Sequence, residues 1–184
     1  MELLTAVNVA LPYLSEHKVT STDSRNPVVD LILDALDRNR LTVLSEGTYL
    51  NTVEKLTLYP DTNNLILAPS KVLSIYGLDY PVRVDNNYLY NIQDDTRFFY
   101  KSVQVRVLRD IPFEDLPYYA AMYITYKATY EVYTASFGID NTANAIAGLS
   151  EEVRRKFTQE DLRNRKYNSI QTNLGSLSFR LLRR

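Results

Sequence analysis

The hydrophobic pattern of this 184-residue chain changes its period twice. Apolar residues recur every three or four positions near the N-terminus, alternate in the middle of the chain, and return to helical spacing after Pro112. A period near 3.6 indicates a helix that buries one face, whereas a period of two indicates a half-buried strand. The sequence therefore predicts an α+β fold in which helices flank a β-rich middle segment.

Two helices are predicted before residue 47. The first has one apolar face and ends near Pro12, because proline interrupts a helix. The second begins at Asn26 and Pro27, since asparagine caps helices and proline is tolerated at the first helical position. Its apolar face consists of Val29, Ile32, Leu33 and Leu36, and the residues predicted to face solvent are Asp30, Asp34, Asp37, Arg38 and Arg40.

Short apolar or aromatic runs fill residues 47–111, and turn-forming residues separate them. The separators include Asn86 and Asn87. Antiparallel strands joined by such turns predict an antiparallel β-sheet or small sandwich. The predicted strands are centred on residues 56–58, 65–67, 72–76, 88–90 and 103–107.

Helical spacing returns between Leu116 and Phe137, and a last helix is predicted from about Asn141 toward Tyr167. Its apolar face thins after Phe157. Neither helix pair could bury its apolar face alone, so we expect residues 1–46 and 112–168 to close into one four-helix bundle. Residues 47–111 would then be a β insertion, and residues 169–184 an extended C-terminal arm.

The net charge of −1 conceals an asymmetry. From residue 151 onward the chain carries a net charge of +5, whereas the preceding part carries −6. The end of the chain mixes apolar and basic side chains, which an extended peptide can dock into another protein's groove. We expect this arm to bind a partner, with a disordered end and nucleic-acid binding as weaker interpretations. The residues in question are Phe179, Arg180, Leu181, Leu182, Arg183 and Arg184.

Six tyrosines lie between Tyr118 and Tyr133, at helical spacing. They could stack nucleic-acid bases, but regular spacing favours packing. Tyrosine is also common at protein interfaces, where one end of the side chain is dry and the other is wet. Core packing and a subunit interface are equally good interpretations for Tyr119, Tyr123, Tyr126, Tyr130 and Tyr133.

The sequence contains no recognisable catalytic or ligand-binding set. Cysteine is absent, which excludes thiol catalysis and thiolate zinc sites. No glycine-rich phosphate motif is present, and the single histidine, His17, lies in a polar loop. We therefore expect no enzyme, no cofactor and no metal site. Acidic residues that could act as paired carboxylates coincide with turn or helix-start signals: Asp94, Asp95, Asp110, Glu114 and Asp115.

No apolar run approaches the ~20 residues needed to span a bilayer. The sequence from Met1 to Leu4 also lacks the basic and apolar regions of a signal peptide. We expect neither membrane insertion nor secretion by that route.

Short motifs distributed from Leu3 to Asn168 resemble one family. The family is tail tubular protein A of short-tailed bacteriophages, also called the tail adaptor or gatekeeper protein. The matching motifs are Thr5-Ala6-Val7-Asn8, Leu58-Tyr59-Pro60-Asp61, Val107-Leu108-Arg109-Asp110, Glu114-Asp115-Leu116-Pro117, Thr125-Tyr126-Lys127-Ala128 and Phe137-Gly138.

The resemblance implies a structural virion protein that forms a ring of twelve copies beneath the phage portal, with the nozzle protein, and possibly tail fibres, attached. It implies that the arm embraces the portal, that DNA passes through the ring without specific binding, and that assembly occurs in the host cytoplasm. The negative charge of the body suits such a channel. Two alternatives are a tail-associated polysaccharide hydrolase using Asp94, Asp95 and Asp110, and a DNA-binding module using Arg180, Arg183 and Arg184.

Overall fold

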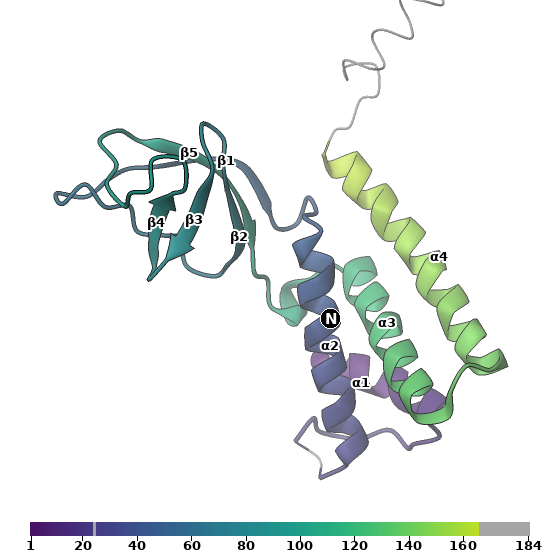
Figure 1. Cartoon of the computed structure of the whole chain (residues 1–184). Coiled ribbons are helices and arrows are strands. Elements are labelled where there is room, and N and C mark those ends of the chain that lie inside the picture. The colour runs from purple at the N-terminus through teal and green to yellow at the C-terminus, as the bar shows by residue number, and fades with distance from the viewer. Residues whose placement is uncertain (24, 166–184) are drawn as a thin grey trace, which may run out of the picture.

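The computed structural model of the protein describes residues 1–23 and 25–165. Four helices form one part of the molecule and five strands form another (Figure 1). The helices are α1 (Leu3–Ala10), α2 (Pro27–Ser45), α3 (Tyr118–Phe137) and α4 (Asn141–Asn164), and the strands are β1 (Thr52–Leu58), β2 (Val72–Gly77), β3 (Val82–Asp85), β4 (Tyr88–Asn91) and β5 (Val103–Arg109). The mixed α+β fold predicted from the sequence is confirmed.

The starts and ends of the first two helices follow from local chemistry. At Pro12 the chain tightens into a 3₁₀ turn (Leu11–Leu14), which ends where Ser15 adopts a left-handed conformation. The Asn26 side chain accepts a hydrogen bond from the backbone N–H of Val28 at 2.9 Å, and Pro27 occupies the first turn of α2. Both boundaries therefore lie where the sequence predicts them.

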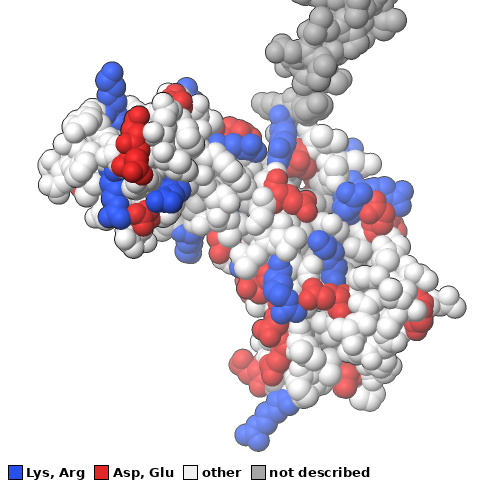
Figure 2. Space-filling model, viewed as in Figure 1, with Lys and Arg blue, Asp and Glu red and all other residues white. Residues whose placement is uncertain are grey.

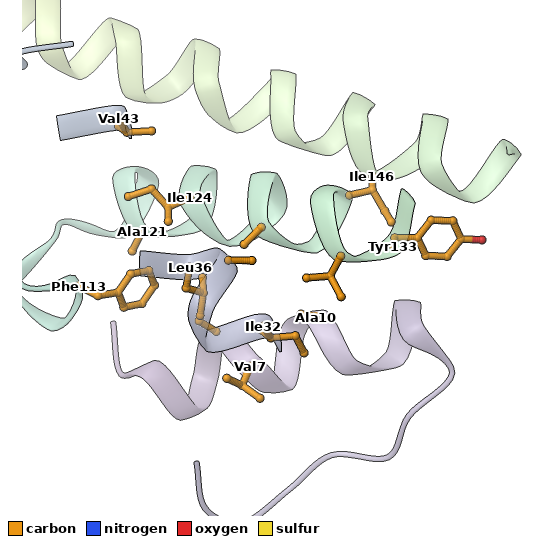
Figure 3. Close-up of a cluster of buried hydrophobic side chains, with 14 of the residues drawn as sticks. Val7, Ala10, Ile32, Leu36, Val43, Phe113, Ala121, Ile124, Tyr133 and Ile146 are labelled. Carbon is orange, nitrogen blue, oxygen red and sulfur yellow. The ribbon is translucent and has the colours of Figure 1, made fainter. Parts of the chain in front are cut away.

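Helix α3 is the centre of the helical part, because one side of it carries small buried residues. Its fully buried positions include Ala120, Ala121, Ala128, Thr125 and Thr129. Small side chains let neighbouring helices approach closely, and α1 and α2 pack on this side. Figure 3 shows side chains of α1 and α2 meeting Ala121 and Ile124 of α3 in one hydrophobic cluster.

Helix α4 packs mainly along α3, so it is an outer helix rather than the fourth member of a closed bundle. In Figure 1, α2 and α4 lie on opposite sides of α3. The reason is compositional: α4 buries only Ala143, Ile146 and Phe157, and most of its remaining surface is polar. The predicted thinning of its apolar face is confirmed, whereas the expected bundle is present only as a core that all four helices share.

The strands form two small antiparallel sheets, with strand order β1-β5-β2 in one and β3-β4 in the other. Asn86 and Asn87 both have positive φ, 50° and 66°, as a tight hairpin between β3 and β4 requires. The predicted strand at residues 65–67 is wrong, since it makes only a single bridge from Leu67 to Tyr88. Strand β3 was not predicted, because it is short, follows Pro81 and alternates valine with charged residues.

The two sheets enclose a hydrophobic core of their own. Its buried members come from β3, β4 and β5 and from two loops: Ile66, Val82, Leu89, Phe99, Val103, Val105 and Val107. The chain therefore has one core among the helices and another among the strands.

Arg40 of α2 was predicted to face solvent, and this is wrong. Its side chain is only 11% exposed and forms an ion pair with Asp37 at 2.7 Å. It also pairs with Asp110 and donates to the carbonyl of Ile111 at 2.8 Å. Burial lowers the pKa of Arg40, but the bonds to Asp37 and Asp110 outweigh burial and leave that pKa raised. The helical periodicity placed Arg40 outside, yet the link from β5 to α3 covers this part of α2.

Two hydrogen bonds to the side chain of Asp140 stabilise the turn between α3 and α4. Gly138 takes a positive φ of 83° at the end of α3. Asp140 then caps α4 by accepting from the backbone N–H of Ala143 at 2.9 Å, and it also accepts from the Tyr133 hydroxyl at 2.7 Å. These two bonds hold the pKa of the Asp140 carboxyl below its ordinary value.

Replacing Ala128 with Leu should destabilise the chain, because the added atoms have no space between α3 and its neighbours. We expect a loss of about 1–3 kcal/mol in the free energy of unfolding, measured by urea denaturation. The control is Ala135→Leu on the exposed end of the same helix, which should change stability by less than about 0.5 kcal/mol. Equal effects of the two substitutions would contradict the close-packing role of the small-residue side.

Because of the two hydrogen bonds to Asp140, the stability of the chain should decrease at acidic pH. Its pKa is lower in the folded than in the unfolded chain, so its contribution is present above the unfolded value of about 3.9 and is lost as pH falls through the lower folded value. Asp140→Asn should therefore flatten the fall in melting temperature between neutral pH and about pH 3. If the melting temperature of the variant changes with pH as that of the natural chain does, the hydrogen bonds to Asp140 do not contribute to stability.

Candidate partner interface

A buried asparagine links the helical and β parts of the molecule. Asn51 is 2% exposed, and its side-chain N–H groups donate to the carbonyls of Leu44 at 2.8 Å and Arg109 at 3.1 Å. Its side-chain oxygen accepts from the backbone N–H of Thr48 at 2.9 Å. Since a buried polar group is costly unless it is paired, these bonds fix the α2–β1 loop against the end of β5.

The last turn of α4 is tied to this same loop. Asp161 accepts a hydrogen bond from the backbone N–H of Tyr49 at 2.6 Å and pairs with Arg165 at 3.0 Å. Arg165 also donates to the carbonyl of Gly47. We call Gly47, Tyr49, Asp161 and Arg165 the junction. It fixes the position at which the chain continues into its C-terminal segment.

The predicted C-terminal arm lies outside the described residues. This applies to all six residues predicted to bind a partner: Phe179, Arg180, Leu181, Leu182, Arg183 and Arg184. The junction therefore defines only the place from which the segment starts.

The predicted tyrosines lie on the side of α3 that α4 covers. Tyr123 lies 6.3 Å from Phe157 of α4 between ring centroids, and Lys156 of α4 lies 5.9 Å from the centre of the Tyr119 ring. Tyr119, Tyr123, Tyr126 and Tyr130 are all partly buried against the helical core, and Tyr133 is a buried member of it. The first four thus contribute to packing and still expose part of their rings.

Burial affects the pKa of two of these tyrosines, Tyr123 and Tyr126. Burial, and next the nearby carboxylate of Glu46, raises the pKa of Tyr123. Burial likewise raises the pKa of Tyr126. Neutral hydroxyls on half-buried rings suit a protein contact, where the ring is covered and the hydroxyl forms a hydrogen bond.

The surface of α4 is charged, and much of this charge is paired within the helix. Glu151 pairs with Arg154 and Glu152 pairs with Lys156, at 2.8 and 2.9 Å. This region is therefore a solvated, salt-bridged face. Figure 2 shows basic and acidic side chains side by side over this part of the molecule.

The carboxylates considered as catalytic candidates serve structural roles. Asp94 accepts from the side chain of Asn91 at 2.8 Å, and Asp95 accepts from the hydroxyl of Tyr90, both in the turn after β4. Asp110 instead pairs with Arg40 beside α2. His17 is exposed. Within residues 1–23 and 25–165 no cluster of histidine, aspartate and glutamate side chains could hold a metal ion.

Among the described helices, none combines the length and the apolar character that crossing a bilayer would require.

Sequence reasoning missed the junction. Its one local signal is the four-residue spacing of Asp161 and Arg165, which favours an ion pair on a helix. The contacts with Gly47 and Tyr49 join residues more than 100 positions apart, so no local sequence pattern could predict them.

Comparison with known proteins agrees with a structural role. Residues 4–167 match the family model described as tail tubular protein. The chain is also 32% identical over 174 residues to tail tubular protein A of Klebsiella phage KP34, an alignment that covers 94% of this chain and 93% of that protein.

These matches identify the class as structural proteins of bacteriophage tails. Within that class, the chain belongs to the tail tubular protein family. The resemblance inferred from short motifs is thereby confirmed, and the place of the protein is the tail of the virion.

Replacing Asp161 with Ala should release the end of α4 from the α2–β1 loop. The substitution leaves the backbone N–H of Tyr49 unpaired, which should cost about 1–3 kcal/mol in unfolding free energy. Amide hydrogen exchange should also become faster at Tyr49 and in the last turn of α4. The matched control is Glu152→Gln, which removes an exposed pair on the same helix and should leave this exchange unchanged. Unchanged exchange in the Asp161 variant would show that the junction does not hold α4.

Proposed function

We propose that this tail tubular protein is a ring-forming adaptor that connects the phage portal to the tail nozzle and lines the DNA exit channel. Membership of the tail tubular protein family carries this proposal. The proposed division is a helical region of residues 1–46 and 112–168, a β insertion of residues 47–111, and an arm of residues 169–184. The helical region builds the ring, and assembly takes place in the host cytoplasm.

The proposed arm binds the portal through Phe179, Arg180, Leu181, Leu182, Arg183 and Arg184. Three apolar side chains supply anchors for a groove, and three arginines supply hydrogen bonds to carboxylates at its rim. The junction supports this role, because a fixed starting point lowers the entropy that the arm loses on binding. Asp161 and Arg165 give the arm such a starting point.

The proposed ring is a dodecamer in which the exposed edges of Tyr119, Tyr123, Tyr126 and Tyr130 border contacts between copies, with Tyr133 supporting them from the core. Their partial burial supports this proposal, because a half-covered ring loses little conformational entropy when a neighbour covers the rest. The nozzle protein and possibly tail fibres are further proposed partners.

DNA is proposed to pass through the ring without specific binding. The net charge of −6 on the first 150 residues supports this, because a negative wall does not attract phosphates. The engaged carboxylates of Asp94, Asp95 and Asp110 give no support to the hydrolase alternative. A DNA-binding role for Arg180, Arg183 and Arg184 would be revealed by salt-dependent binding of duplex DNA to the full chain.

Removing residues 179–184 should abolish binding to the portal protein of the same phage while the chain stays folded. Binding would be measured by surface plasmon resonance, and folding by circular dichroism. The control is the full-length chain with Ser176→Ala and Ser178→Ala, which should bind the portal normally. Normal binding by the truncated chain would show that the arm is not the portal contact.

A further inference from the structure

Helices α2 and α4 present outer faces of opposite charge on opposite sides of α3 (Figure 1). On α2, Asp30 and Asp34 are exposed one helical turn apart, next to Leu31, whose side chain is 53% exposed. On α4, Arg155 and Arg163 are exposed near Leu162, which is 46% exposed. Each face therefore combines an exposed leucine with two charges of one sign, and the oppositely charged neighbours, Arg38 on α2 and Glu151 and Glu152 on α4, are engaged in ion pairs.

These charges have no ion-pair partner among the described residues. Asp37 and Arg38 of α2 are paired with Arg40 and Glu131. Glu151, Glu152 and Asp161 of α4 are paired with Arg154, Lys156 and Arg165, and Glu160 is the one acidic residue of α4 with no ion pair among the described residues. What remains is an acidic surplus on the α2 face and a basic surplus on the α4 face. An exposed apolar centre with a charged rim has the composition of a protein interface.

The surface of α4 is open at Gly148. Gly148 lies two turns before Arg155 on the same side of α4, and a side chain added there would meet no atom within 4 Å. Residues seven positions apart lie on one side of a helix, so Gly148, Arg155 and Leu162 form a single stripe with space for a neighbouring helix.

We propose that the α2 face of one copy, formed by Asp30, Leu31 and Asp34, binds the α4 face of the next copy, formed by Arg155, Leu162 and Arg163. The inference rests on the self-association proposed above and adds a pair of complementary faces to the tyrosine edges proposed to border the contacts between copies. Because α3 separates the two faces in one chain, they cannot meet within a copy. The contact is head-to-tail, and repetition of a head-to-tail contact closes a ring when the rotation between copies allows it.

Charge reversal with a mixing step tests this contact. One full-length variant carries Asp30→Lys with Asp34→Lys, so both of its faces are basic. A second carries Arg155→Glu with Arg163→Glu, so both of its faces are acidic. Assembly is followed by mass photometry for each chain alone and in the presence of the portal ring, and folding is checked by circular dichroism.

Each variant alone should need a roughly tenfold or higher concentration to assemble, because like charges then face each other across every contact. An equal mixture of the two variants should assemble like the natural chain, since every contact in an alternating ring again joins opposite charges. The single substitutions Asp34→Lys and Arg155→Glu provide milder versions if a double variant loses its fold.

Matched controls carry the same change of charge away from both faces. They are Glu2→Lys with Asp79→Lys, and Lys18→Glu with Lys55→Glu, all at exposed positions. Both controls should assemble normally. Normal assembly of the charge-reversed variants, or a folded mixture that fails to recover, would overturn this interface and leave the proposed function standing. A natural chain that stays monomeric with and without the portal ring would overturn the proposed ring itself.

Discussion

The close approach of helices on one side of α3 is the constraint from which the rest of the helical architecture follows. Alanine and threonine at the buried positions let α1 and α2 pack against the α3 backbone. The threonines remain compatible with a dry core because their hydroxyls bond back to the helix, with Thr125 donating to Ala121 at 2.8 Å and Thr129 to Thr125 at 2.7 Å. The bulky rings are thereby confined to the other side of α3, where they form the surface on which α4 lies.

The position of α4 in turn determines where the molecule can meet its partners. As an outer helix, α4 keeps a long polar side available, and its last turn reaches the loop that Asn51 fixes against β5. Three distant segments thus converge on the point where the C-terminal segment starts. The arm of the proposed portal contact begins at this point, and the proposed contact between copies uses the outer face that α4 keeps free when it packs on α3.

Local chemistry made several parts of the fold predictable. Asn26 with Pro27 specifies a helix start, and Asn86 with Asn87 specifies a turn that requires positive φ. In both cases a few adjacent residues determine the local structure, so it can be predicted from the sequence. The junction could not be predicted in this way, since Tyr49 and Asp161 meet only after α4 has packed. Arg40 shows the same limit, because helical periodicity gives the side of α2 on which it lies but not the linker that covers it. The tyrosines were placed on the correct helix, yet their relation to α4 depends on which side of α3 the small residues occupy.

The small-residue side of α3 also has a consequence for how the family can diverge. At Ala120, Ala121 and Ala128 the structure restricts volume more than chemical type, so glycine, serine or alanine can exchange there while larger residues are excluded. The tyrosine side is open at its edges and tolerates changes of size. Homologous chains can therefore drift far apart in sequence along one side of this helix and remain nearly invariant in side-chain size along the other.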